Sequence, residues 1–176
     1  MLMPHLGMGE QPYYLVKLIT QEGNKSAARH KKLTFTLIAR ISSMQALVIA
    51  LYSDDSSVRH TVISALGKQL DPTLPLHEIK EFATADALRL YVDNKKQVDL
   101  FILDGEAVPE GGMGVGRQLK DEVFNCPPVL LIIGREQDKW LATWSKAEAV
   151  VTHPIDPFTI AGKCAQLLKT SAALAN

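Results

Sequence analysis

Short, fully apolar runs alternate with stretches of helical character from about residue 46 onward. Ala46–Tyr52 and Val129–Ile133 are apolar throughout, which is typical of strands buried on both faces of a sheet. Between the runs, residues such as Val58, Val62 and Leu66 recur at helical spacing. Strands that alternate with helices over short connections predict a parallel sheet covered by helices on both faces.

The boundaries of the predicted elements follow from the same pattern. We expect five strands, over Ala46–Tyr52, Leu76–Ala83, Val98–Leu103, Val129–Ile133 and Ala149–Thr152. A glycine-rich loop is expected over residues 105–114, and a helix over Asp138–Ala147. Asp156 is expected to cap the last helix, with Pro157 in its first turn. The predicted fold is α/β and flavodoxin-like, a (βα)5 three-layer sandwich with strand order 2-1-3-4-5.

The first part of the chain lacks this pattern. Residues 1–44 carry six Lys or Arg against two acidic residues. We interpret residues 1–45 as an irregular, poorly ordered N-terminal extension and residues 46–172 as one domain. A basic arm that contacts an acidic partner is the alternative interpretation.

Composition limits the kinds of partner. The net charge of +0 gives no general electrostatic attraction to nucleic acid or to a membrane, and no apolar run is long enough for a transmembrane span. Cys126 and Cys164 lack the spacing of metal ligands. Two free thiols favour a reducing, cytoplasmic location.

Three acidic residues follow two of the predicted strands. Asp54 and Asp55 come after the first strand, and Asp104 ends the third. In the order 2-1-3 these strands are neighbours, so the three carboxylates are expected to converge where parallel sheets bind ligands. Clustered carboxylates repel one another unless a cation compensates, and their oxygens suit Mg²⁺. For a single acidic residue, helix capping or bonding to turn amides is the simpler interpretation.

Residues 46–170 resemble the receiver domain of bacterial two-component response regulators. The resemblance is carried by ALVIALYSDD, VDLFILDGEAVP, PPVLLIIG and VVTHPIDP. It implies that Asp54 and Asp55 are the metal-binding acid pair and that Asp104 is the phosphoacceptor. The backbone carbonyl of Glu106 would be a further ligand of Mg²⁺. The implied partners are a histidine kinase or another phosphodonor, and a downstream protein.

Two positions depart from the usual receiver pattern. Ile133 stands where receivers carry a Thr or Ser, and His153 stands where they carry a Lys before a cis-proline. Isoleucine cannot donate a hydrogen bond to a phosphoryl oxygen, and an imidazole is only partly charged at neutral pH. In the acidic pocket His153 could pair with Asp104; a histidine bonded only to the backbone is the equal alternative. The combination resembles atypical receivers, found notably among actinobacterial proteins.

The resulting functional prediction is a stand-alone signalling receiver without an output domain, and not an enzyme. Its output would pass to a protein partner through the face of the fourth strand, fourth helix and fifth strand. A homodimer would form through the face of the fourth helix, fifth strand and fifth helix. Trp140 and Trp144 could anchor that contact, although half-core, half-surface placement is the simpler expectation. The alternative is a phosphorylation-independent interaction module or small-molecule binder of the same fold. A phosphatase would need a Lys and further acidic residues that the pattern does not provide.

Overall fold

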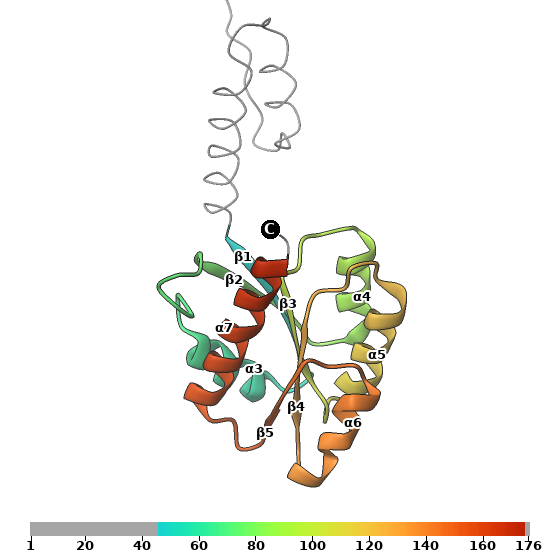
Figure 1. Ribbon diagram of the computed structural model, residues 1–176. Helices are drawn as coiled ribbons and strands as arrows, with labels where there is room; N and C mark the ends of the chain where they lie inside the picture. Colours follow the sequence, from blue (N-terminus) through green and yellow to red (C-terminus); the bar gives the residue numbers. More distant parts are fainter. Residues whose placement is uncertain (1–45, 175–176) are drawn as a thin grey trace, which may run out of the picture. The chain divides into compact units, whose positions relative to one another are not determined.

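The computed structural model describes residues 46–174. A five-stranded parallel sheet with the order β2-β1-β3-β4-β5 runs through its centre (Figure 1). The strands are β1 (Leu47–Tyr52), β2 (His77–Phe82), β3 (Leu100–Asp104), β4 (Val129–Ile133) and β5 (Ala149–Thr152). The predicted fold and strand order are confirmed. The proposed extension, residues 1–45, lies outside the described residues.

Helices cover both faces of the sheet, with α3 and α7 on one side and α4, α5 and α6 on the other (Figure 1). The helices are α3 (Ser56–Leu66), α4 (Ala85–Asp93), α5 (Gly112–Glu122), α6 (Lys139–Trp144) and α7 (Pro157–Leu174), with a short 3-10 turn η1 (Glu136–Asp138) before α6. Within residues 46–174, no helix is both long and apolar enough to cross a membrane.

The alternation of side chains along each strand divides the core into two layers. Ile49 and Leu51 of β1 pack beneath α3 and α7, whereas Ala50 and Tyr52 face α4 and α5. All five side chains of β3 and all five of β4 are buried. Burial on both faces explains why these two strands are apolar at almost every position. Asp104, the last residue of β3, is the exception.

Helix α5 begins earlier than the sequence predicts. It starts at Gly112, inside the expected glycine-rich loop of residues 105–114. A Cβ at Gly112 would lie 2.5 Å from the carbonyl oxygen of Asp104 and 2.9 Å from Cβ of Leu103. Glycine therefore lets the first turn of α5 pack directly on the end of β3, and the glycine-rich segment serves this close approach in addition to making a loop.

The helix predicted over Asp138–Ala147 is also different. It is a 3-10 turn followed by the six residues of α6. Trp140 is 66% exposed and Trp144 is 52% exposed, so the expectation that one of them is part of the core is wrong. The guanidinium of Arg117 lies 5.9 Å from the centre of the Trp144 ring, a cation–π contact that helps to hold this tryptophan on the surface.

Other local predictions are confirmed. The carboxylate of Asp156 accepts a hydrogen bond from the backbone N–H of Thr159, 2.7 Å away, at the start of α7. Both cysteines are free thiols. Cys164 is a fully buried residue of α7, and burial raises the pKa of its thiol to about 12. Cys126 is only partly buried.

Candidate functional site

The register of β1 and β3 determines which side chains meet at the end of the sheet. Tyr52 pairs with Leu103, so the next pair along the two parallel strands is Ser53 and Asp104. The backbone N–H of Ser53 still donates to the carbonyl of Phe82 on β2, 3.2 Å away. Ser53 therefore continues the alternation of β1, and its side chain points to the same face of the sheet as Asp104.

Ser53 and Asp104 form a direct hydrogen bond. The hydroxyl of Ser53 donates to Oδ2 of Asp104 at 2.7 Å, and the backbone N–H of Glu106 donates to Oδ1 at 3.0 Å. Ser53 is fully buried and Asp104 is only 3% exposed. Both oxygens of the Asp104 carboxylate thus have a donor from the protein, as a buried carboxylate requires. Ser53 was not among the residues singled out from the sequence, although the period of two along β1 could have indicated it.

The carboxylate of Asp55 is engaged at the start of α3. Asp55 is the N-cap of α3, and its Oδ1 accepts hydrogen bonds from the backbone N–H and the hydroxyl of Ser57, both at 2.7 Å. These hydrogen bonds lower the pKa of the Asp55 carboxyl group. The alternative that one acidic residue caps the first helix therefore describes Asp55.

Asp54 lies exposed between Ser53 and Asp55. The turn that presents it is held by Arg59 of α3, whose Nη1 donates to the carbonyl oxygens of Ser53 at 2.7 Å and of Asp54 at 3.2 Å. The Nε of Arg59 also forms an ion pair with Glu81, 3.1 Å away. The structure thus fixes the backbone of the turn and leaves the Asp54 carboxylate at its surface.

The carboxylate of Glu106 contacts the end of β4. Its Oε1 accepts a hydrogen bond from the backbone N–H of Gly134 at 3.2 Å. The turn after Asp104 is closed by the N–H of Ala107, which donates to the carbonyl of Asp104 at 3.3 Å. Residue 106 therefore contributes its N–H to Asp104 and its side chain to the neighbouring strand end.

Ile133 and His153 lie at the ends of β4 and β5. Ile133 is fully buried and packs in the layer under α4, α5 and α6. Asp104 continues the alternate positions of Leu100 and Ile102 on β3, which belong to the opposite layer. The backbone N–H of His153 donates to the carbonyl of Ile133 at 2.9 Å, and the His153–Pro154 peptide is cis. Among the ion pairs of residues 46–174, none joins His153 to Asp104.

Several carboxylates act on Tyr52 at this end of the sheet. Tyr52 has a raised pKa, first because it is buried and then because of the charges of Glu110, Asp54 and Asp104; the charge of Arg89 opposes the shift. Two carboxylates and a backbone carbonyl are hard oxygen donors, and Mg²⁺ commonly uses only one or two carboxylates together with waters. Asp54, Asp104 and Glu106 therefore fit this ion chemically. Within the described part of the chain, no three His, Cys, Asp or Glu side chains are grouped as metal ligands.

Solved structures identify the class of fold. No family model matches the chain. The BeF3-activated receiver domain of DrrB, a Thermotoga maritima protein, has a TM-score of 0.58 and 18% identity over 71% of this chain and 99% of that domain. A CheY-like receiver domain protein of Methanospirillum hungatei has a TM-score of 0.60 and 15% identity over 73% of this chain and 98% of that one. The described residues thus have the fold of a CheY-like receiver domain.

Two curated relatives identify the family. They are uncharacterized response regulatory proteins from two strains of Mycobacterium tuberculosis, each 48% identical over 130 residues, which are 74% of this chain and 97% of the relative. The chain belongs to this family of response regulatory proteins, and its receiver domain is that of a two-component system. Their mycobacterial origin agrees with the actinobacterial resemblance.

Proposed function

We propose that this protein is a phosphorelay receiver that accepts a phosphoryl group on Asp104. The observation that carries the proposal is the position of Asp104, the one acidic residue buried at the end of the central strand β3. Its Oδ1 is oriented by the N–H of Glu106, two residues further along. A carboxylate held in one orientation loses little freedom when it attacks, which favours in-line transfer.

The transfer itself is a displacement at phosphorus. A carboxylate oxygen of Asp104 forms the new O–P bond while the bond from phosphorus to the donor breaks. With a histidine kinase the leaving group is an imidazole, which keeps the electron pair of the broken P–N bond and takes a proton. The carboxylates of Asp54 and Asp104 and the backbone carbonyl of Glu106 would hold Mg²⁺. When bound, this ion neutralises charge on the phosphoryl oxygens.

Asp55 contributes charge rather than a ligand oxygen in this proposal. Its Oδ1 is committed to Ser57 at the start of α3, so the acid pair implied by the resemblance is reduced to Asp54. His153 occupies the position of the usual lysine and would place a donor, instead of a permanent charge, near the phosphoryl group.

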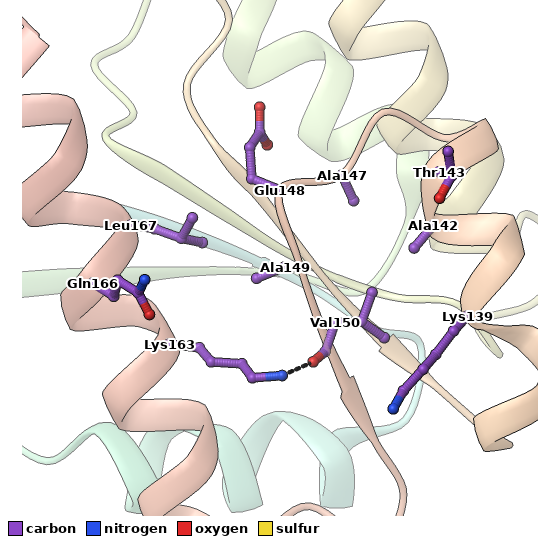
Figure 2. A pocket seen from close by; sticks show the side chains of 10 residues that line it. All are labelled: Lys139, Ala142, Thr143, Ala147, Glu148, Ala149, Val150, Lys163, Gln166 and Leu167. Carbon is purple, nitrogen blue, oxygen red and sulfur yellow. Dashed lines mark hydrogen bonds between the residues drawn. The ribbon is translucent and has the colours of Figure 1, made fainter.

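Output would pass through the face formed by α6, β5 and α7. A groove of about 390 Å³ runs along β5 between the two helices, with Lys139 of α6 and Lys163 of α7 at its sides (Figure 2). The ammonium group of Lys163 donates to the carbonyl of Val150 (Figure 2). Trp140 is exposed on the same helix as Lys139. A downstream protein or a second copy of the chain would dock here, in the cytoplasm, where the free thiols stay reduced.

The test is phosphorylation by a small donor. The protein is incubated with Mg²⁺ and acetyl phosphate, and its intact mass is compared with that of Asp104→Asn. We expect the wild type to gain one phosphoryl group that hydroxylamine removes, and Asp104→Asn to gain none. Asp156→Asn is the matched control, because asparagine caps a helix as well as aspartate does. A wild type without any gain would contradict the proposal.

A second candidate function is favoured by a specific observation. Donors within the protein already satisfy both oxygens of Asp104, and the carboxylate of Glu106 already occupies the N–H of Gly134. Such a site is complete without a phosphoryl group. If no phosphoryl gain is observed while Asp104→Asn still changes binding of a partner or small molecule, a phosphorylation-independent binding module is the better description.

A further inference from the structure

A neutral side chain stands beside Asp104 where the resemblance leads us to expect a carboxylate. The hydroxyl of Ser53 is 2.7 Å from Oδ2 of Asp104, in a contact that is buried on both sides. The residue that completes the predicted acid pair, Asp55, instead caps α3. The side chain that faces Asp104 from β1 is therefore a hydrogen-bond donor without charge.

We propose that Ser53 is a positioning residue, which holds the carboxylate of Asp104 in place through a neutral hydrogen bond. Because Ser53 adds no negative charge to the site, the site binds Mg²⁺ weakly. The proposal rests on the function proposed above and concerns the same site. It assigns a role to a residue that the acid-pair pattern passes over.

The side chains of Ser53 and Asp104 interact differently from a pair of carboxylates. Two carboxylates in hydrogen-bond contact repel each other unless a cation or a shared proton lies between them. A hydroxyl in the same place donates to the carboxylate, so Asp104 is held in its orientation without a cation. The site then has one negative charge fewer among its ligands. A carboxylate site with fewer negative charges binds a divalent cation less tightly.

Ser53 is itself held on three sides. Its Oγ accepts a hydrogen bond from the backbone N–H of Asp55 at 3.2 Å. Its own N–H donates to Phe82 on β2, and its carbonyl accepts from Arg59 of α3 at 2.7 Å. A residue fixed in this way has little freedom to turn its hydroxyl oxygen away from Asp104. Its position is set by the pairing of the strands, and the hydrogen bond to Asp104 follows from that position.

Three substitutions separate the roles of the hydroxyl. Ser53→Ala removes the donor, Ser53→Thr keeps it, and Ser53→Asp introduces the carboxylate. The matched control is Ser145→Ala, since Ser145 is also fully buried but donates to the carbonyl of Ala142, 2.8 Å away. Two quantities are measured on the full chain: the carbon-13 signal of the Asp104 carboxyl group without metal, and the dissociation constant of Mg²⁺ alone.

We expect Ser53→Ala to shift or broaden the Asp104 carboxyl signal, Ser53→Thr to restore it, and Ser145→Ala to leave it unchanged. Ser53→Asp is expected to bind Mg²⁺ about tenfold or more tightly than the wild type. The proposal is overturned if Ser53→Ala moves the signal no more than Ser145→Ala does, or if Ser53→Asp binds Mg²⁺ no more tightly. If Ser53→Ala does not fold, the Thr and Asp variants decide the question.

These two measurements and the phosphorylation test described above together distinguish this inference from the proposed function. Wild type that binds Mg²⁺ through Asp104, with variants of Ser53 that change neither quantity, defeats only the positioning role. A wild type that takes up no phosphoryl group defeats the proposed function. The carboxyl signal of Asp104 without metal still decides whether Ser53 positions Asp104.

Discussion

The carboxylate of Glu106 and the backbone N–H of Gly134 are joined by a hydrogen bond of 3.2 Å. This contact ties the turn after β3 to the end of β4, and the Glu106 carboxylate fills the space beside Gly134. A Cβ at Gly134 would lie 2.9 Å from Oε1 and 3.0 Å from Cδ of Glu106. An alanine would therefore have to displace the carboxylate.

Gly134→Ala should thus break this hydrogen bond at little cost to the fold. Because the displaced atoms are the end of a flexible side chain, we expect the free energy of unfolding to change by less than about 1 kcal/mol. In a protein that keeps Gly134, the single substitution Glu106→Ala should shift the amide signal of Gly134 in a nitrogen-15 NMR spectrum. An unmoved signal would mean that the contact is not formed in solution. Gly162→Ala is the control, since a Cβ there meets nothing within 4 Å.

Gly112→Ala should be far more damaging. The added Cβ would lie 2.5 Å from the oxygen and 2.8 Å from the carbon of the Asp104 carbonyl group, and backbone cannot rotate away as a side chain can. We expect a loss of about 2 kcal/mol or more in urea unfolding, in the upper range of overpacking. Gly114→Ala, in the same helix with nothing within 4 Å of the new Cβ, should be neutral or stabilising. Equal effects of the two substitutions would argue against close packing of α5 on β3.

Asp54 and Asp55 should respond differently to neutralisation. Asp55→Asn keeps a good helix cap and removes a carboxylate that is already committed to Ser57, so Mg²⁺ affinity should change little. Asp54→Asn should weaken Mg²⁺ binding about tenfold or more. Titration with Mg²⁺, followed by NMR or calorimetry, compares the two. Equal weakening would restore Asp55 as a ligand, as the acid-pair pattern predicts.

The ion pair of Asp71 with Lys169 should make stability depend on pH. The hydrogen bond from Lys169 and those from Thr73 hold the pKa of the Asp71 carboxyl group well below its usual value. Since the folded state favours the ionised form, this stabilisation is present above the unfolded pKa of about 3.9 and is lost as the pH falls below it. Urea unfolding of wild type and Asp71→Asn should therefore differ at pH 7 and converge in acid.

Much of the fold follows from sequence patterns that burial imposes. The runs that became β3 and β4 are apolar because both faces of each strand are covered, and Asp104 stands out as the polar end of one of them. Its position at the centre of the sheet follows from the strand order. These features could be predicted because each depends only on period and on the general geometry of parallel sheets.

The details of the site depend on where a strand stops pairing. Two acidic residues after β1 predicted two side chains at the site, but β1 stays extended for one further residue, which directs Ser53 inward and leaves Asp55 to cap α3. The start of α5 could not be predicted for a similar reason. The sequence does not distinguish a glycine in a loop from a glycine in the first turn of a closely packed helix. Both outcomes are decided by tertiary contacts at the ends of elements, where local preference is weakest.

The complete burial of Ile133 restricts how the Asp104 end of the sheet can communicate with the surface. A hydroxyl side chain at the end of β4 could swing between two positions at small cost, but an isoleucine that leaves the core exposes its whole apolar surface, at about 1.5–3 kcal/mol, and leaves a void behind. The side chain of Ile133 therefore keeps one position in the core. A rearrangement at Asp104 would reach α6 through the main chain that begins at Gly134, as a shift of the whole loop rather than the turn of one side chain.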